Sequence, residues 1–423
     1  MSELGESPLT TGDRQLSVAE ARAAIHAALQ PVAGTESVPV TQALGRVLAA
    51  DVISPIDVPA HDNSAMDGYA FDGAALRADG PTVLHSVGTV HAGTPWPGVV
   101  AAGQCLRIMT GAVMPAGCDT VVPQELCRAD GAQVSIAPGV IRAGENRRRQ
   151  GEDLARGRAA LRAGRVLRPA DLGLVASLGH AVVAVRRRLR VALFSTGNEV
   201  QAPGQPLAPG CIYDSNRYSL TGALQRLGCE VVDLGLVRDD PAALRATFER
   251  AVAEADAVLT SGGVSVGDAD YTRTLMAELG DVAFWKVAMR PGRPFAFGPL
   301  HGAEGRRAWL FALPGNPVAA LVTFYAFARE ALLVLAGATP EPLPTLQLPC
   351  TSAIRKRPGR TEFQRGIVER GADGAWQVRL TGAQGAGILR SLSEANALVV
   401  LGHEQGSVAA GGAVTVWLFD GLV

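Results

Sequence analysis

Three short polar segments of this chain are suited to binding a phosphate ester. They are Ser195-Thr-Gly-Asn-Glu199, Arg238-Asp-Asp240 and Ser261-Gly-Gly-Val-Ser-Val-Gly-Asp-Ala-Asp270. Glycine-rich turns expose backbone N–H groups to an oxyanion, and carboxylates are the ligands that Mg²⁺ combines with substrate phosphates. A glycine pair or a single aspartate is more often a plain turn or a helix cap, so the prediction rests on the three segments together. The predicted metal ligands are Glu199, Asp239 and Asp270, and the predicted substrate-binding residues are Ser261, Gly262, Gly263, Ser265, Gly267 and Asp270.

Two further loops combine glycine and proline, and one of them suits an anion. Arg290-Pro-Gly-Arg-Pro294 presents two guanidinium groups, whose planar N–H forks bind oxyanions well. Leu313-Pro-Gly-Asn-Pro317 has a similar pattern, although it could simply begin the helix that follows.

All five segments follow predicted strands. From Leu189 onward strands alternate with helices, which implies a parallel sheet covered on both faces. The predicted strands are residues 189–195, 230–236, 256–260, 282–288 and 308–312, and the predicted helices are residues 216–227, 241–254, 270–279 and 316–337. Ligands of open parallel sheets bind beyond the carboxyl ends of the strands, because loops and helix N-termini converge there. We therefore expect the polar segments to meet at one edge of the sheet.

The rest of the chain indicates further domains. Ser17-Val-Ala-Glu20 is a capping box that predicts a helix, and short β-rich runs cut by glycine and proline predict small β domains. The predicted fold class is multidomain α/β plus β, with a parallel-sheet domain, two small β-rich domains and a connecting domain. The expected divisions are an N-terminal helix within 1–28 that packs on the α/β domain, a connecting domain from 29–53 and 151–185, a β-rich domain at 54–150, the α/β domain at 186–338 and a C-terminal β-barrel domain at 339–423.

Composition excludes several classes of protein. The 423 residues have a formal net charge of -1, which argues against nucleic acid or an anionic membrane as the main partner. Six cysteines without a C-x-x-C pair predict reduced thiols rather than disulfides or a zinc site. The N-terminus lacks the basic and apolar regions of a signal peptide, so a cytoplasmic location is expected. The apolar stretch 317–338 is interrupted by Arg329 and Glu330, which predicts a buried helix rather than a membrane span.

Three further segments lie outside the α/β region. The polar loop Asp62-Asn-Ser-Ala-Met-Asp-Gly-Tyr-Ala70 has no hydrophobic period. Arg107-Ile-Met-Thr-Gly111 is a short predicted strand that ends in Thr-Gly, and Gly144-Glu-Asn-Arg-Arg-Arg-Gln-Gly-Glu-Asp153 is a charged loop. Periodicity alone would leave them as turns and solvated surface.

Taken in order, these segments resemble the molybdopterin molybdenumtransferase family, known as MoeA in bacteria and as the E domain of gephyrin and its plant counterpart. The resemblance spans nearly the whole chain. Its marks are residues 62–70, 107–112, 144–153, 195–199, 212–216, 261–271, 291–295 and 313–318. It implies an elongated homodimer of four-domain subunits with a molybdopterin-binding-like α/β domain and a cleft shared between subunits. The implied reaction inserts molybdate into adenylated molybdopterin and releases AMP with the help of Mg²⁺.

The resemblance also assigns roles to individual residues. Asp67 matches the family's essential aspartate, and catalytic roles are expected for Asp67, Thr110, Asp153, Glu199 and Lys286. Pro314 and Pro317 join the predicted substrate-binding set. The chain departs from the family at Asn198, where an aspartate is frequent, and at Arg290 and Arg293, where lysine is favoured. Only Lys286 and Lys356 are lysines among 39 basic residues, so a lysine retained at position 286 suggests a need for a compact ammonium, or only ancestry.

Molybdate is a compact dianion that requires cations and hydrogen-bond donors. The predicted molybdate ligands are Arg290, Arg293, Arg360 and Ser391, the last two from the C-terminal domain. Because the family's cleft is shared, we expect Arg360 to act across the subunit interface.

Two other functions remain open from the sequence. A molybdopterin adenylyltransferase resembles the α/β domain alone, but its loop reads Gly-Gly-Thr-Gly where this chain has Ser-Gly-Gly-Val-Ser, and three further domains would lack a role. A non-catalytic cofactor carrier or scaffold is the second alternative. The adenylyltransferase and recipient molybdoenzymes are the expected protein partners.

Overall fold

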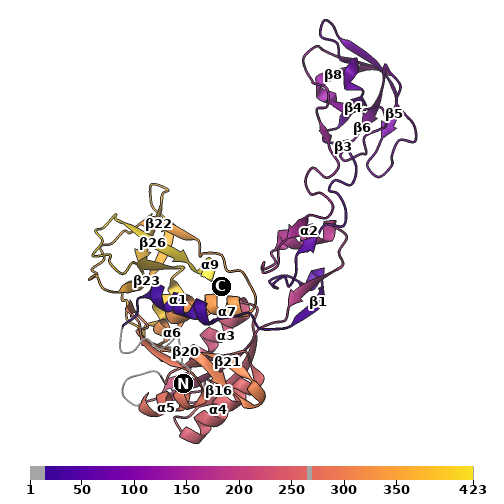
Figure 1. Ribbon diagram of the computed structural model, residues 1–423. Helices are drawn as coiled ribbons and strands as arrows, with labels where there is room; N and C mark the ends of the chain where they lie inside the picture. The colour runs from indigo at the N-terminus through magenta and orange to yellow at the C-terminus, as the bar shows by residue number, and fades with distance from the viewer. Residues whose placement is uncertain (1–14, 264–268, 423) are drawn as a thin grey trace, which may run out of the picture.

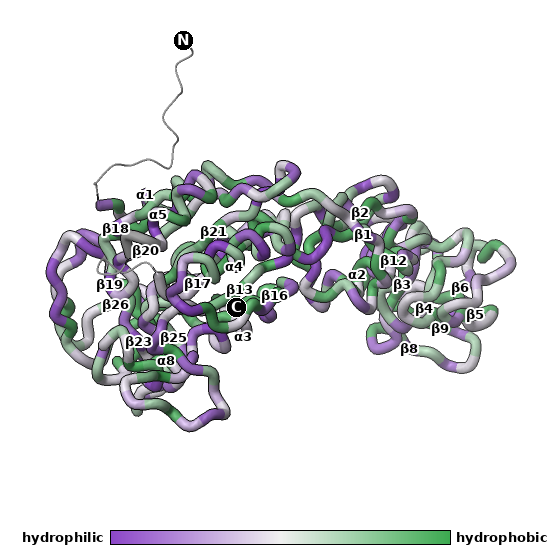
Figure 2. The backbone as a smooth tube through the Cα atoms, turned by 90° about the horizontal axis from the view of Figure 1, so that it is seen from below, coloured by the Kyte–Doolittle hydropathy of each residue, from purple (hydrophilic) through white to green (hydrophobic). Residues whose placement is uncertain are grey.

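The computed structural model describes residues 15–263 and 269–422 of the chain. These residues form a large body made of the α/β and C-terminal domains, a narrow stalk, and a small β domain at the far end of the stalk (Figure 1). A view turned by 90° also places the small β domain and the large body at opposite ends (Figure 2). The elongated shape therefore separates two groups of predicted site residues.

The α/β domain is built on a six-stranded sheet with the order β16-β13-β17-β21-β20-β18. The strands are β13 (Arg190–Thr196), β16 (Glu230–Val237), β17 (Ala257–Ser261), β18 (Ala283–Lys286), β20 (Pro294–His301) and β21 (Arg307–Leu313). Four neighbours, from β16 to β21, run parallel, which confirms the expected sheet. The sheet is nevertheless mixed. The strand β20, which the sequence did not predict, runs antiparallel to both of its neighbours, because the short turn 302–306 can only return the chain as a hairpin.

Helices cover both faces of this sheet. On one face, α3 (Asn216–Arg226) and α6 (Pro317–Thr323) share an apolar core with Val191 and Leu193 of β13. On the other face, α4 (Pro241–Glu254) and α5 (Ala269–Leu279) share a second apolar core with Ala192 and Phe194. Successive residues of β13 thus enter two different cores, as expected for a strand that is buried on both faces.

The longest apolar helical stretch lies inside the large body. It comprises α6, a π-helical turn η5 (Phe324–Ala328) and α7 (Arg329–Leu335). The stretch Pro317–Leu335 is long and apolar enough to cross a membrane, but 72% of its apolar 18-residue segment is buried in the protein. The expected buried helix is therefore confirmed.

The N-terminal helix α1 (Val18–Ala28) begins at the predicted capping box, in which Ser17 and Glu20 each accept from the other's backbone N–H. Ala21 and Ile25 join the core that lies between the sheet and α6. Arg22 donates to the carbonyl of Ala326 in the π-helical turn at 2.8 Å. The helix is thus fixed to the α/β domain by both apolar and polar contacts.

Two strand pairs and a helix form the stalk. The strand β1 (Thr35–Pro39) pairs with β12 (Val182–Arg186), and β2 (Val52–Ile53) pairs with β11 (Ala159–Leu161). The helix α2 (Pro169–Ser177) packs beside them, and a small apolar cluster joins these elements. Outgoing and returning segments, far apart in sequence, therefore build one connecting unit.

The distal domain is a six-stranded sheet with the order β7-β4-β6-β5-β9-β8. Its strands are β4 (Gly68–Phe71), β5 (Thr82–Val90), β6 (Gln104–Ile108), β7 (Thr120–Pro123), β8 (Cys127–Asp130) and β9 (Gln133–Ile136). Two apolar clusters pack against the sheet. A short pair, β3 (Asn63–Ser64) with β10 (Arg147–Arg148), lies where the domain meets the stalk (Figure 1).

The C-terminal domain is a curved antiparallel sheet with the order β23-β25-β26-β22, and β24 pairs with the other edge of β23. Its elements are β22 (Thr345–Pro349), β23 (Thr361–Arg370), β24 (Trp376–Leu380), α8 (Leu389–Glu394), β25 (Ala397–Leu401), β26 (Ala413–Leu418) and α9 (Phe419–Leu422). A bridge from Cys350, just after β22, to Val378 in β24 brings two edge strands of this sheet together. The segment β19 (Met289–Arg290) from the α/β domain adds to β23 in parallel and joins the two domains.

All six cysteines have free thiols, which confirms the expectation of no disulfide. Burial raises the pKa of the Cys105, Cys118 and Cys229 thiols to about 12. These thiols stay protonated near neutral pH and are poor nucleophiles.

Candidate functional site

The strand register brings the predicted polar segments to one edge of the α/β sheet. Ser195 of β13 is level with Ser261 of β17, and Ser261 is level with Leu313 of β21. Thr196 is level with Val237, the last residue of β16. The loops that follow these four strands therefore leave the sheet together, as the sequence predicted.

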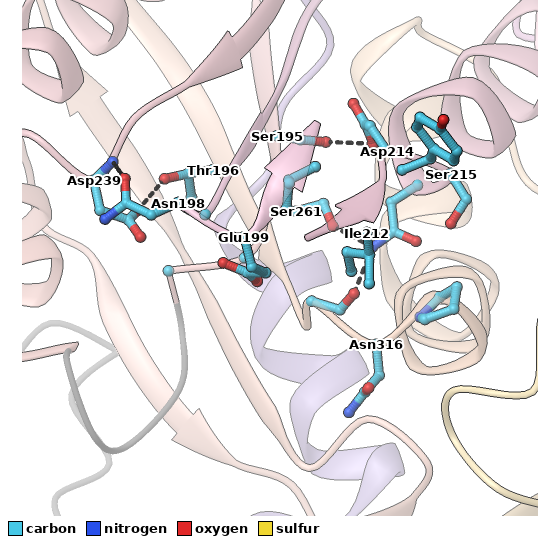
Figure 3. Close-up of a pocket in the computed structure, with 18 of the residues that line it drawn as sticks. Ser195, Thr196, Asn198, Glu199, Ile212, Asp214, Ser215, Asp239, Ser261 and Asn316 are labelled. Carbon is cyan, nitrogen blue, oxygen red and sulfur yellow. Dashed lines mark hydrogen bonds between the residues drawn. The ribbon is translucent and has the colours of Figure 1, made fainter. Parts of the chain in front are cut away.

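These loops surround a cavity of about 940 Å³. Three carboxylates, from Glu199, Asp214 and Asp239, line it, and Ser261, Gly262 and Gly263 form part of its wall. Asp239 and Asp214 lie on opposite sides of the cavity (Figure 3). Among the described lining residues there is no lysine or arginine, so we refer to it as the acidic cavity.

Asp239 is held by the loop that follows β13. The Thr196 hydroxyl donates a short hydrogen bond to Asp239 Oδ1. The Asp239 backbone N–H donates to Asn198 Oδ1 at 3.3 Å. Asn198 thus links two loops through its amide oxygen. This hydrogen bond does not require the charge that an aspartate would carry at this position.

A second polar network joins the other loops. Asp214 is almost fully buried and accepts from the Ser195 hydroxyl at 3.1 Å and from Arg217 Nε at 3.0 Å. Asn216 Nδ2 donates to Ser261 Oγ at 2.6 Å and to the Gly315 carbonyl at 2.7 Å. These bonds fix the loops after β13, β17 and β21 relative to one another.

Asp214 and Asn216 were not among the predicted site residues. They lie in the segment 212–216, which the sequence marked only through its family resemblance. A buried polar pair at the start of a helix is not distinguishable from ordinary caps by sequence pattern. The partners of Asn216, which are Ser261 and Gly315, lie 45 and 99 positions further along the chain, so only the folded structure shows what this residue does.

The glycine pair after β17 is required by the backbone. Gly262 has φ +101° and Gly263 has φ +71°, and both values lie in the left-handed region. A Cβ on Gly262 would stand 2.5 Å from the Thr196 carbonyl oxygen. The close approach keeps the loops after β13 and β17 side by side at the cavity.

Gly262→Ala is expected to lower the thermal unfolding midpoint and raise the substrate concentration for half-maximal turnover, because a strained residue costs about 1–3 kcal/mol. The matched control is Gly222→Ala within α3, where an added Cβ meets nothing within 4 Å. That change should stabilise by about 0.5–1 kcal/mol. Equal behaviour of the two variants would show that the close approach at Gly262 is unimportant.

A smaller pocket of about 360 Å³ adjoins the acidic cavity. Arg290, Arg293 and Arg360 line it, and no carboxylate does among its described lining residues, so we call it the arginine pocket. Gly315 and Asn316 line both spaces. Pro314 lies on the arginine pocket, whereas Pro317 lies on the acidic cavity.

The arginine pocket lies at the seam between two domains of one chain. Pairing of β19 with β23 sets Arg290 beside Glu362, and Arg360 Nη2 pairs with Glu362 Oε1 at 2.7 Å. Arg290 and Arg360 thus lie together within one chain, while the expected action of Arg360 across a subunit interface stays a prediction. They meet because β19 extends the C-terminal sheet and carries Arg290 towards Arg360.

Some predicted residues are not brought into either space. Lys286 is exposed at the end of β18, outside the lining of both. Ser391 is 4% exposed, and its hydroxyl accepts from Arg365 Nε at 3.0 Å, so it does not line the arginine pocket. Ser265, Gly267 and the side chain of Asp270 lie outside the described residues.

Three predicted catalytic residues lie on the distal arm. Pairing of β4 with β6 places Asp67, just before β4, close to Thr110, just after β6. Thr110 donates to Asp67 Oδ1 at 2.7 Å from both its backbone N–H and its hydroxyl. These bonds and the nearby Arg107 lower the pKa of Asp67, so it is a carboxylate near neutral pH. Asp153 is exposed at the base of this domain, where its backbone N–H donates to Val58.

In one chain, the stalk separates the distal β domain from the α/β domain (Figure 1). Asp67, Thr110 and Asp153 belong to the distal domain and its base, and the acidic cavity lies in the α/β domain. We refer to the stalk and the distal domain together as the arm. Within one chain, the predicted residues of the α/β domain come together with the three arginines, whereas the distal residues do not. Those that come together are Glu199, Asp239, Ser261, Gly262, Gly263 and the loop at residues 313–317, which we call the proline loop.

Magnesium was predicted at Glu199, Asp239 and Asp270. Within residues 15–263 and 269–422 no group of three or more His, Cys, Asp or Glu side chains is arranged to hold a metal. Two members of the predicted set, Glu199 and Asp239, line the acidic cavity. Because Mg²⁺ retains waters and is commonly held by one or two carboxylates plus substrate phosphates, these oxygen donors fit it.

Three family models match the chain in order. They are the MoeA N-terminal region (domain I and II) at residues 16–179, the probable molybdopterin binding domain at 192–333, and the MoeA C-terminal region (domain IV) at 347–419. Together with the cavity at the carboxyl edge of the sheet, they define a multidomain α/β protein with a molybdopterin-binding domain.

Full-length relatives give the family. The chain is 40% identical over 390 residues to a molybdopterin molybdenumtransferase of Haemophilus influenzae, covering 92% of this chain and 95% of that one. It is 38% identical to molybdopterin molybdenumtransferase 2 of Mycobacterium tuberculosis, covering 90% and 94%. The crystal structure of the molybdopterin biosynthesis moeA protein of Pyrococcus horikoshii OT3 matches with a TM-score of 0.82 at 27% identity, covering 96% and 100%. The chain therefore belongs to the molybdopterin molybdenumtransferase family, the transferases of molybdenum cofactor biosynthesis.

Proposed function

We propose that the chain inserts molybdate into adenylated molybdopterin with Mg²⁺-dependent release of AMP. The observation that supports this is the pair of adjoining spaces of opposite charge. The acidic cavity and the arginine pocket share Gly315 and Asn316, so two ligands bound in them would meet at that point.

The acidic cavity suits the phosphate of adenylated molybdopterin when a divalent cation lies between them. Carboxylates alone repel a phosphate, but Glu199 and Asp239, with the expected Asp270, would hold Mg²⁺ against it. The bound cation would neutralise negative charge on the phosphate. Ser261, Gly262 and Gly263 would bind the substrate, and Pro317 would shape the wall beside it.

The arginine pocket suits molybdate. Arg290, Arg293 and Arg360 offer guanidinium donors to a compact dianion, and Pro314 forms part of the same wall. Ser391 would act through Arg365 rather than by direct contact, since its hydroxyl already accepts from that guanidinium. Lys286 lies at the same edge of the sheet but outside both spaces, so its proposed role is to attract anionic substrates.

A second copy of the chain would complete the cleft. Asp67, Thr110 and Asp153 lie on an arm that does not reach the acidic cavity of its own chain (Figure 1). A homodimer in which each arm reaches the partner's cavity would bring the Asp67 carboxylate to the reacting centre. There the Asp67 carboxylate would orient a reacting group or accept a proton from it, since Asp67 is ionised and is held in place by Thr110.

The product is expected to serve cytoplasmic molybdoenzymes, and the substrate is expected from an adenylyltransferase. The purified chain, given adenylated molybdopterin, molybdate and Mg²⁺, should yield a product that activates a molybdenum-free apo-enzyme. An adenylyltransferase would instead form adenylated molybdopterin from molybdopterin and ATP, and a carrier would release bound cofactor without any turnover. Either of those results would replace the proposal.

Arg360→Ala is expected to raise the molybdate concentration for half-maximal turnover by about 10- to 100-fold, because a hydrogen bond to a charged group contributes about 1.5–3 kcal/mol. The affinity for adenylated molybdopterin should change much less. Steady-state turnover against each substrate in turn makes this measurement.

Arg360→Ala leaves the buried Glu362 without its charged partner, so a second variant is needed. Arg290→Ala removes a cation from the same pocket and should have the same selective effect. The control is Arg379→Ala, whose side chain pairs with Glu369 on the exposed surface of β24. A molybdate dependence unchanged in both pocket variants would rule out this pocket as the oxyanion site.

A further inference from the structure

Arg365 is a fully buried arginine in β23 with no carboxylate beside it. Its exposure is 0%, and among residues 15–263 and 269–422 no Asp or Glu pairs with it. Burial, together with the charge of Arg290, lowers the pKa of Arg365 to about 10. A buried charge is costly, so the groups that satisfy it indicate what it is used for.

The guanidinium binds one short loop. Its nitrogens donate to the carbonyls of Ala383 at 3.3 Å, Gln384 at 3.3 Å and Gly385 at 3.0 Å. Nε donates to Ser391 Oγ at 3.0 Å, just beyond the same loop. The Arg365 backbone N–H also donates to Gln384 Oε1 at 2.7 Å. One residue therefore fixes the path of the chain from Ala383 to Ser391.

This loop is a wall of both ligand spaces. Gln384 and Ala386 line the arginine pocket, whereas Gly387 and Leu389 line the acidic cavity. The backbone N–H of Val318, at the start of α6, donates to the Ala386 carbonyl at 3.0 Å. The loop is thus attached to the proline loop on one side and to Arg365 on the other.

We propose that Arg365 is a positioning residue that holds residues 383–389 as the common wall of the arginine pocket and the acidic cavity. Only a guanidinium has enough N–H groups in one plane to bind three carbonyls and a hydroxyl at once. Lysine would keep the charge but lose this geometry. The identity of the two ligands rests on the proposed function, whereas the positioning of the loop does not.

Arg365→Lys tests this inference with two measurements. Hydrogen exchange of the backbone amides of residues 383–391 and of Val318 should become at least about 10-fold faster, since their hydrogen-bonded frame loosens. The half-saturating concentrations of molybdate and of adenylated molybdopterin should both rise by about 10-fold, because both spaces share the loop. Arg290→Ala, in contrast, should raise only the half-saturating concentration of molybdate.

Two further variants make the result decisive. Gln384→Ala removes a side chain that contacts Arg365 and should reproduce part of both effects even if Arg365→Lys fails to fold. Arg379→Lys on the surface of β24 is the matched control and should leave exchange and both concentrations within twofold of the unmodified chain.

The inference would be overturned if Arg365→Lys left the hydrogen exchange and both half-saturating concentrations unchanged. If Arg365→Lys does not fold, the same result in Gln384→Ala would overturn it. Faster exchange with unchanged concentrations would also overturn it, because the loop would then be loosened without consequence for binding. If the unmodified chain binds no molybdate, the proposed function fails, and the exchange data alone decide whether Arg365 positions the loop.

Discussion

Asp67→Asn is expected to reduce turnover of adenylated molybdopterin by about 10²- to 10⁴-fold, the usual contribution of a positioned acid or base. Thr110 can still donate to the amide oxygen, so the loop should keep its shape. The loss would come from the missing carboxylate. In the unmodified chain, turnover should decrease on acidification as pH falls through the lowered pKa of Asp67, because protonation then removes the same charge.

Asp130→Asn, in the exposed strand β8 of the same distal domain, is the control and should leave turnover unchanged. Mixed dimers test the shared cleft. A subunit with Asp67→Asn combined with one carrying Asp239→Asn should restore one intact cleft per heterodimer. Verified heterodimers that remain as inactive as both parents would contradict the exchange of arms, and normal turnover by Asp67→Asn would make this residue a plain turn residue.

Asp239→Asn is expected to lower the rate of AMP release by about 10²- to 10³-fold, the size seen when one group that stabilises developing charge is removed. It should also raise the Mg²⁺ concentration needed for half-maximal release. Thr196 can donate to the amide oxygen as it does to the carboxylate, so folding should be retained. AMP release titrated with Mg²⁺ makes the measurement.

The neighbouring Asp240→Asn is a closely matched control. Asp240 caps α4 by accepting from the Ala243 backbone N–H at 2.9 Å. Asparagine is an equally good N-cap residue, so this variant should keep both stability and AMP release. If Asp239→Asn behaves like Asp240→Asn at limiting Mg²⁺, Asp239 does not hold the cation.

Much of the α/β domain could be predicted because its pattern is local. Buried strands and amphipathic helices of normal length repeat from Leu189 onward, and the rule for carboxyl ends of parallel strands then selected Glu199, Asp239 and Ser261. The strand β20 was missed because Pro294, Gly298 and Pro299 make its sequence typical of a loop. It is accommodated by hairpin pairing with β21, which is a tertiary contact.

Contacts between distant segments could not be predicted. Arg360 lies beside Arg290 only because β19 leaves the α/β domain and pairs with β23. Arg365 has the pattern of an ordinary polar strand residue, and its burial depends on a loop 18 to 20 positions further along the chain. Neither hydrophobic periodicity nor motif spacing contains this information.

Molybdate in the arginine pocket and the phosphate ester in the acidic cavity are expected to take part in one reaction. The most direct test of this expectation is AMP release from adenylated molybdopterin by the purified chain in a single turnover, with molybdate and Mg²⁺ each present or omitted. We expect release only when both are present, together with formation of the molybdenum cofactor. AMP release at the same rate without molybdate, or none with both present, would contradict the account.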